Sequence, residues 1–284
     1  MRIVRTISDM RQVVREARTA GQHIGFVPTM GAFHDGHRAL MRAARVDGGL
    51  VVASLFVNPA QFGPNEDLAA YPRDEKRDAD LARDAGVDVL FAPTASEIYP
   101  GGFATTIHIT GVTEILCGAV RGAEHFDGVA TVVTKLFTIV QPDTAYFGQK
   151  DAQQVVVIRR LVRDLNLDVR IVACPIVRED DGLAMSSRNV YLTPSDRRRA
   201  TALNAALTAA NAAFATGERN TAALLSAARR VLDADGISPE YLELRRADDL
   251  AAVGETVTDE AILAVAARVG AARLIDNRTL GGDA

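Results

Sequence analysis

The sequence has two cysteines, no tryptophan and no large excess of charge of either sign. Cys117 and Cys174 are too few for a disulfide framework and are not spaced as metal ligands, so we expect a protein of the reducing cytoplasm. The formal net charge is −4 and long runs of lysine or arginine are absent, which argues against a non-specific nucleic-acid binder. Hydrophobic residues make up 48% of the chain, enough for a packed core, and this excludes a disordered protein.

Long hydrophobic runs are also missing. The longest apolar stretch, Leu50–Val57, has about eight residues, whereas roughly 20 are needed to span a bilayer. Residues 1–12 alternate apolar with charged side chains and lack the apolar centre of a signal peptide. We therefore expect no membrane partner and no targeting segment in this stretch.

Short apolar runs and amphipathic stretches alternate over residues 1–175. The expected strands are residues 23–28, 50–57, 87–91, 144–147 and 169–173, and the expected helices are residues 37–47, 73–85, 128–141 and 151–165. Repeated strand–helix–strand units predict an α/β fold, a Rossmann-like open parallel sheet with helices on both faces. Ligands bind such sheets at the carboxyl ends of the strands, so the loops after strands are the place to look for chemistry.

The composition changes after about Pro175. Residues 195–216 and 221–234 are rich in alanine and predict helices, and short apolar runs follow at 240–244, 261–266 and 272–275. We interpret this part as a smaller α+β domain. The predicted division is therefore residues 1–175 and residues 176–284.

The densest group of functional side chains lies in residues 28–37, between the first strong strand and the first strong helix. His34 and His37 stand at a helix N-terminus, where exposed N–H groups and the helix dipole favour an anion such as phosphate. Gly31 and Gly36 allow the backbone to approach a ligand. A lone histidine would be read as core or surface, and zinc is a rival use of the pair, but no third ligand stands at a suitable spacing. The P-loop and Gly-x-Gly-x-x-Gly patterns are absent.

A second donor-rich segment, residues 147–154, follows a strand and opens a helix. Lys150 can neutralise phosphate, Gly148 permits a close backbone approach, and Asp151 can cap the helix or bind a ribose hydroxyl. A capped turn with a solvated lysine explains the same residues equally well. Taken alone, this segment leaves both interpretations open.

A third segment, residues 182–189, contains Ser186, Ser187 and Arg188. Their hydroxyl and guanidinium groups are donors for phosphate oxygens, although an ordinary polar loop at a domain boundary has a similar composition. Three donor-rich loops in one chain, without a metal cage, predict that a nucleoside triphosphate is bound by electrostatic interactions.

Neutral amides follow the most apolar strand. Asn58 and Gln61 are placed at the edge of the predicted sheet, where amides suit the recognition of hydroxyl and carboxylate groups. The alternative is a turn in which Asn58 bonds the backbone before Pro59. His125 precedes a predicted helix and either binds ligand or lies beside the helix N-cap.

With these residues in place, the chain resembles the pantothenate synthetase (pantoate–β-alanine ligase) family of the nucleotidyltransferase superfamily with His-x-Gly-His. The resemblance rests on segments in the family's order: Pro-Thr-Met-Gly-x-x-His-x-Gly-His, Phe-Val-Asn-Pro-x-Gln-Phe, Tyr-Pro-Arg, Phe-Gly-x-Lys-Asp-x-Gln-Gln and Gly-Leu-Ala-Met-Ser-Ser-Arg-Asn. It implies ATP-dependent condensation of (R)-pantoate with β-alanine to pantothenate, AMP and pyrophosphate, through pantoyl adenylate. It also implies Mg²⁺ with the ATP and a homodimer, which apolar residues of a strand after Phe103 would serve.

The resemblance also implies roles for individual residues. The catalytic residues would be His34, His37 and Lys150, with His37 as a proton donor. The ATP site would consist of Met30, Gly31, Ala32, Phe33, His34, Asp35, Gly36, His37, Gly148, Gln149, Lys150, Asp151, Val177, Met185, Ser186, Ser187 and Arg188, the last four in a lid loop of the C-terminal domain. Pantoate would contact Met30, Gln61 and Gln154, β-alanine would contact Gln61 and His125, and Asp78 would bind Mg²⁺.

The chain departs from the family pattern in one segment that matters here. Residues 121–126 are one residue longer than the usual Arg-Pro-x-His-Phe, which affects the placement of Arg121 and His125. Two rival functions are another adenylyl- or cytidylyltransferase and a non-catalytic nucleotide-binding module. Gln61 and Gln154 favour the ligase over the first rival, and the intact phosphate-binding set argues against the second.

Overall fold

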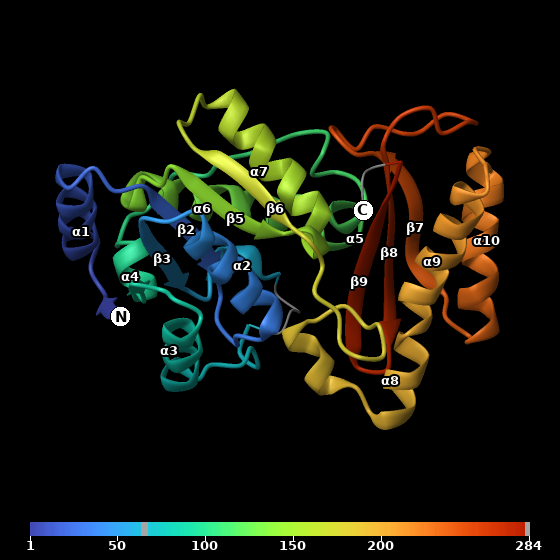
Figure 1. The fold of residues 1–284 in the computed structure, drawn as a ribbon, viewed down its shortest axis with the longest axis horizontal. Helices are drawn as coiled ribbons and strands as arrows, with labels where there is room; N and C mark the ends of the chain where they lie inside the picture. Colours follow the sequence, from blue (N-terminus) through green and yellow to red (C-terminus); the bar gives the residue numbers. More distant parts are fainter. Residues whose placement is uncertain (64–67, 282–284) are drawn as a thin grey trace.

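The computed structural model describes residues 1–63 and 68–281. Its larger sheet has six parallel strands in the order β1-β4-β3-β2-β5-β6 (Figure 1). The strands are β1 Arg2–Val4, β2 Ile24–Thr29, β3 Leu50–Leu55, β4 Val89–Phe91, β5 Thr144–Gly148 and β6 Arg170–Cys174. The helices around them are α1 Ile7–Thr19, α2 Asp35–Val46, α3 Glu75–Asp84, α4 Ala95–Ile98, α5 Cys117–Arg121, α6 Glu124–Val140 and α7 Ala152–Asp164. The predicted Rossmann-like parallel sheet is confirmed.

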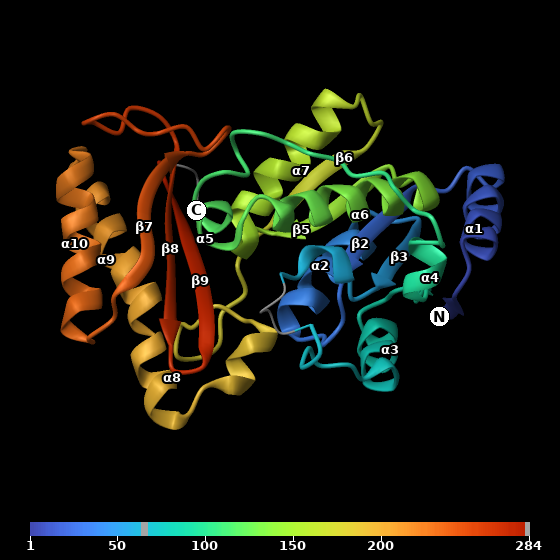
Figure 2. The same ribbon diagram turned by 180° about the vertical axis from the view of Figure 1, so that it is seen from behind.

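Side chains of the central strands alternate between the two faces of this sheet, as strand geometry requires. Phe26 and Val52 pack with α1, α6 and α7, whereas Val27 and Ala53 pack with α2 and α3. Figures 1 and 2 show α2 and α6 on opposite faces. Because both faces are covered, the central strands are apolar on both sides, and their sequences have no polar alternation.

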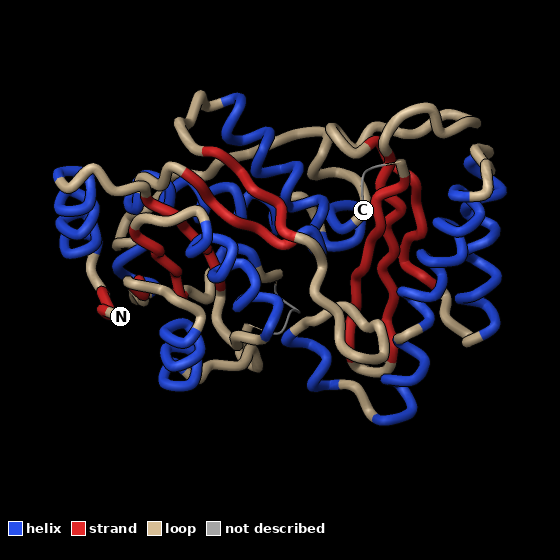
Figure 3. The backbone as a smooth tube through the Cα atoms, in the orientation of Figure 1, coloured by secondary structure: helices blue, strands red, loops and turns tan. Residues whose placement is uncertain are grey.

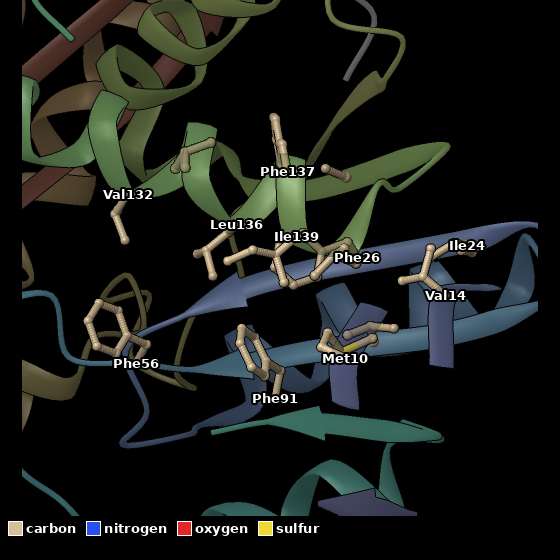
Figure 4. Close-up of a cluster of buried hydrophobic side chains, with 14 of the residues drawn as sticks. Met10, Val14, Ile24, Phe26, Phe56, Phe91, Val132, Leu136, Phe137 and Ile139 are labelled. Carbon is tan, nitrogen blue, oxygen red and sulfur yellow. The ribbon is translucent and has the colours of Figure 1, made fainter. Parts of the chain in front are cut away.

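The face under α1 and α6 carries the largest aromatic packing. Figure 4 shows Phe26, Phe91, Leu136 and Phe137 in this cluster, and the rings of Phe26 and Phe137 meet edge to face with their centroids 6.4 Å apart. All four side chains are almost fully buried. This packing fixes the strands relative to α6 and so fixes the loops at their carboxyl ends.

The C-terminal part contains a separate antiparallel sheet of β7 Pro239–Arg246, β8 Ala261–Val269 and β9 Ala272–Leu280, in the order β7-β8-β9. Its helices are α8 Pro194–Ala200, α9 Ala202–Ala215 and α10 Thr221–Ala234. Figure 3 shows the strands in two separate groups, as predicted for an α/β sheet with a smaller α+β unit. The division at residue 175 stays a prediction.

Two sequence-based element predictions were wrong. The predicted single helix 195–216 is two helices that meet at Thr201. The sequence did not indicate this break, because an alanine-rich pattern favours helix throughout. The predicted strand after Phe103 is also absent, since the described residues 104–110 form no strand. Ile107 packs against the hydrophobic cluster that contains the buried side chains of α6. Its backbone N–H donates to the side chain of Thr131 in α6 at 2.9 Å, so it does not need a partner strand.

Among the described residues, each helix is too short or too polar to cross a bilayer.

Candidate active site

A cleft of about 240 Å³ opens at the carboxyl ends of the central strands, where parallel sheets bind their ligands. We call it the central cleft. It is lined by Met30, His34, Gly36, His37, Gln61, His125, Gly148, Lys150, Asp151, Gln154, Val177, Met185, Ser186, Ser187 and Arg188, all of them residues that the sequence predicted to bind ligands. Segments far apart in the sequence therefore meet in one place.

Some of the predicted ligand-binding residues do not line this cleft. They are Gly31, Ala32, Phe33, Asp35, Asp78 and Gln149. The Phe33 side chain is fully buried among α2 and α3, and the carboxylate of Asp35 pairs with Arg38 at 2.7 Å. Their assignment to ligands stays a prediction.

The two histidines of the motif cap α2 reciprocally. His34 Nδ1 accepts a hydrogen bond from the Gly36 N–H at 3.2 Å, and the His34 N–H donates to His37 Nδ1 at 3.4 Å. The ring centroids lie 4.1 Å apart. Because each Nδ1 accepts an N–H, each neutral ring carries its proton on Nε2.

Burial, reinforced by the positive charge of Lys150, lowers the pKa of His34 to about 4. Burial also lowers the pKa of His37 well below its ordinary value, and His34 and Lys150 add to this effect. Both rings are therefore neutral hydrogen-bond donors at neutral pH. This favours stabilisation of phosphate charge through Nε2–H over the proton transfer predicted for His37.

We expect the ring of His34 to stay neutral in the free protein above about pH 5.5, because protonation would place a positive charge in a buried site beside Lys150. Ring ¹³C and ¹⁵N chemical shifts, assigned with His34→Gln, measure this directly. A titration midpoint near the ordinary value of 6.5 would show that burial and Lys150 do not keep the His34 ring neutral.

Asp78 holds the loop before the histidines. Its Oδ2 accepts from the Ala32 N–H and its Oδ1 from the Phe33 N–H, both at 2.8 Å. The backbone is left-handed there, with φ of +89° at Gly31, which glycine adopts freely, and +52° at Ala32, which is strained. A Cβ on Gly31 would stand 2.9 Å from Asp78 Oδ2. Asp78 is 1% exposed and burial raises its pKa. The carboxylate therefore serves as an internal anchor of the histidine loop, and its predicted contact with Mg²⁺ stays a prediction.

Asn58 fixes the orientation of the Gln61 amide. Asn58 Nδ2 donates to Gln61 Oε1 at 3.1 Å and to Gly128 O at 3.0 Å, while its Oδ1 accepts from the Tyr99 hydroxyl at 2.7 Å. The Oδ1 also accepts from the Ala60 N–H at 3.3 Å, so the alternative prediction of a turn is correct as well. The Gln61 Nε2 donates one hydrogen to Met30 Sδ at 2.9 Å. With its oxygen engaged as well, Gln61 has its second N–H to offer to a ligand.

The amides of Asn58 and Gln61 are positioned by a close approach between two backbone segments. A Cβ at Gly128 of α6 would lie 2.2 Å from Ala60 O, so only glycine allows α6 to reach the short 3₁₀ helix η1 Pro59–Gln61. Beyond Gly128, α6 presents an apolar wall to the cleft. The wall consists of Val129, Val132, Val133 and Leu136.

The longer segment before His125 still brings Arg121 into the cleft. His125 Nδ1 donates to Gln61 O at 2.8 Å, and its Nε2 accepts from Arg121 Nη1 at 2.9 Å. Gly122 accommodates the extra length with φ of +93°. Arg121 and Tyr71, a largely buried residue of the same cleft, were not predicted as ligand-binding residues, although both occur in segments that the sequence singled out.

Positive charge dominates the central cleft. Among its described lining residues, Arg121, Lys150 and Arg188 are cationic and Asp151 is the one acidic side chain. Lys150 Nζ lies 3.7 Å from the Asp151 carboxylate, and the Lys150 side chain is 20% exposed. Such a site binds a polyanion with neutral donors beside it.

A cationic cleft at the carboxyl ends of an open parallel sheet is typical of α/β enzymes whose substrates contain phosphate. The family model described as Pantoate-beta-alanine ligase matches residues 2–279. The chain belongs to this family, as the sequence predicted.

Individual relatives agree with the family model. The chain is 55% identical to the pantothenate synthetase of Syntrophobacter fumaroxidans over 98% of both chains. It is 47% identical to the crystal structure of pantothenate synthetase from Thermus thermophilus, with a TM-score of 0.93, covering 98% of this chain and 99% of that one. A structure from Francisella tularensis, titled as a complex with beta-gamma ATP and beta-alanine, is 34% identical with a TM-score of 0.80, covering 98% of this chain and 97% of that one.

Proposed function

We propose that the chain condenses (R)-pantoate with β-alanine, using ATP, to give pantothenate, AMP and pyrophosphate. The pantoate carboxylate attacks the α-phosphorus of ATP and pyrophosphate leaves. The amine of β-alanine then attacks the carbonyl carbon of pantoyl adenylate and releases AMP. The observation that carries this proposal is that the proposed phosphate donors line the same cleft as the amides of Gln61 and Gln154.

Displacement at phosphorus needs positioning and neutralisation of charge more than covalent help from the protein. Lys150 and Arg188 supply positive charge, and the neutral rings of His34 and His37 supply Nε2–H donors. Gln61 presents the N–H that Met30 Sδ does not accept to the hydroxyl or carboxylate of pantoate, with Gln154 as the second amide. His125 and the backbone of Gln61 form the side of the cleft proposed for β-alanine.

We propose that Mg²⁺ accompanies the triphosphate. Among the described residues no group of three or more His, Cys, Asp or Glu side chains stands ready to hold a metal ion. Both oxygens of Asp78 already accept backbone N–H groups. Asp151 is the one acidic side chain among the described residues that line the central cleft. Bound Mg²⁺ would neutralise phosphate charge, and since this ion keeps most of its ligands from water and phosphate, it needs little from the protein.

We also propose a homodimer, as the resemblance implied, and a location in the cytoplasm, which the two unpaired cysteines favour. The candidate contact surface is the segment 103–110, in which every residue except Ile107 and Ile109 is exposed. Sedimentation velocity measures this assembly directly.

With ATP and β-alanine present, we expect the purified protein to form AMP and pantothenate only when pantoate is also supplied. The measurement is AMP release across a set of candidate acids, with the His37→Ala variant as the control for contaminating enzymes. AMP formation that is indifferent to pantoate would favour a different acceptor. No AMP with any acid would favour a non-catalytic nucleotide-binding module.

A further inference from the structure

The turn that carries Lys150 has no side-chain cap of its own. Residues Gln149–Asp151 form a 3₁₀ helix, η2, that leads directly into α7. Neither Gly148 before this turn nor Asp151 before α7 makes a side-chain capping hydrogen bond. The conformation of the Lys150 backbone therefore depends on partners from elsewhere in the fold.

Those partners come from the C-terminal sheet. Asn277 of β9 donates from Nδ2 to both Gln149 O and Lys150 O, each at 2.9 Å. An amide nitrogen has two hydrogens, so each carbonyl receives one. In Figures 1 and 2, β9 is the strand of its sheet that lies towards the larger sheet, which places Asn277 against the turn after β5.

The neighbouring residue of β9, Asp276, holds a second segment of the cleft through an ion pair with Arg178. Asp276 is 4% exposed and accepts from Arg178 at 2.7 and 3.0 Å. Arg178 directly follows Val177 and also donates to Gly182 O at 3.1 Å, so it holds the start of the lid loop. Two adjacent residues of one strand thus support both phosphate-binding segments outside the histidine motif.

Packing alone does not explain an amide at position 277. The side chain is 3% exposed, and its Oδ1 is buried without a hydrogen-bond partner among the described residues. A buried unpaired acceptor lowers stability, and an apolar side chain of similar volume would avoid that cost. The amide is explained by the two hydrogen bonds that its Nδ2 donates to Gln149 O and Lys150 O.

We propose that Asn277 is a positioning residue for adenylate formation, which fixes the Lys150 turn so that the ammonium group meets the triphosphate. Asn277 lines an adjoining cavity that shares Lys150 and Arg188 with the central cleft, but it does not line the central cleft itself. Both N–H groups of its amide are donated to the Lys150 turn, so it acts through Lys150. The inference rests on the proposed role of Lys150 in the first half-reaction. It predicts that the two half-reactions respond differently to a change at position 277.

The test uses Asn277→Leu in the full chain, which keeps the volume of the side chain and removes both donors. ATP–pyrophosphate exchange with pantoate measures the first half-reaction. Enzyme loaded with pantoyl adenylate, freed of ATP and mixed with β-alanine, measures the second. We expect exchange to fall by about tenfold to a hundredfold and the second half-reaction to change by less than about twofold, because only the first needs Lys150 at the phosphates.

The matched control is Arg278→Ala, the next residue of β9, whose side chain lies on the other face of the strand. We expect both of its half-reactions to match those of the unchanged protein. Thermal unfolding shows which variants fold, and if Asn277→Leu does not, Asn277→Thr carries the test with a shorter side chain.

A double variant separates positioning from general damage. In a Lys150→Ala background, Asn277→Leu should lower exchange by less than about a further threefold, because the group that it positions is gone. Equal loss in both half-reactions, or no loss, would overturn the role of Asn277. If Lys150→Ala alone leaves exchange unchanged, the role of Lys150 itself is wrong, and the inference falls with it.

Discussion

Lys150→Ala is expected to lower the rate of pantoyl adenylate formation by about a hundredfold to a thousandfold, because a charged donor aimed at developing phosphate charge is lost. Folding stability should change by less than about 1 kcal/mol, since among the described residues the ammonium group makes one ion pair, a long contact of 3.7 Å with Asp151. ATP–pyrophosphate exchange and thermal unfolding measure the two effects. This separation of activity from stability distinguishes a binding group from a structural one.

Lys150 also influences the histidines, and this gives a second measurement. Its positive charge is one cause of the lowered pKa of His34. Removing it should raise that pKa towards the ordinary value, and the midpoint of the His34 ring titration would move to higher pH.

The chain offers a matched control in Lys76, an exposed lysine of α3 away from the central cleft. Lys76→Ala should leave exchange and the His34 titration unchanged. Near-normal exchange in Lys150→Ala would show that the phosphates bind elsewhere.

Local patterns predicted most of the fold because they report local forces. An apolar run such as Leu50–Val57 marks a strand covered on both faces, and Gly-rich junctions after strands mark loops that approach ligands. The three-residue strand β1 was not predicted, since so short a segment has no periodicity. The amphipathic helix α1 was missed as well, because residues 1–12 were considered only as a possible targeting segment.

Partners distant in the sequence were beyond prediction. Asp78 lies in a charged helix where most acidic side chains face solvent, and only the folded structure shows that its carboxylate meets the Ala32 and Phe33 amides. Asn277 lies in a strand of the other sheet, and its contact with Lys150 O depends on how the two sheets dock. Residue type and spacing report what a side chain can do, whereas its partner is decided by tertiary packing.

Asp78→Ala is expected to damage folding and activity together. The substitution leaves the Ala32 and Phe33 amides buried without their acceptor, at a cost of about 1–3 kcal/mol each, so we expect a total loss of roughly 2–5 kcal/mol in the free energy of unfolding. The strained backbone at Ala32 would relax and displace His34 and His37. We expect exchange to fall by about a hundredfold, since misplacement by about 1 Å is costly in an active site.

The same variant tests the predicted contact of Asp78 with Mg²⁺. If the carboxylate were mainly a metal ligand, its removal would leave folding stability nearly unchanged and raise the Mg²⁺ concentration needed for activity. As an anchor, its removal lowers stability, and added Mg²⁺ does not restore exchange. Asp78→Asn should fall between Asp78→Ala and the unchanged protein, because its one oxygen still accepts from one amide while its NH₂ group faces the other N–H.

Asp80→Ala is the matched control on the same helix. Asp80 pairs with Arg83 at 2.6 Å on the surface, with both side chains about half exposed. Exposed pairs contribute little, so unfolding and exchange should match those of the unchanged protein. Because both substitutions remove one carboxylate from α3, a difference between them isolates the hydrogen bonds to the histidine loop from the change in helix charge. The geometry of that loop would then depend on Asp78, a side chain that does not line the central cleft. The placement of His34 and His37 at the phosphates would depend on it as well.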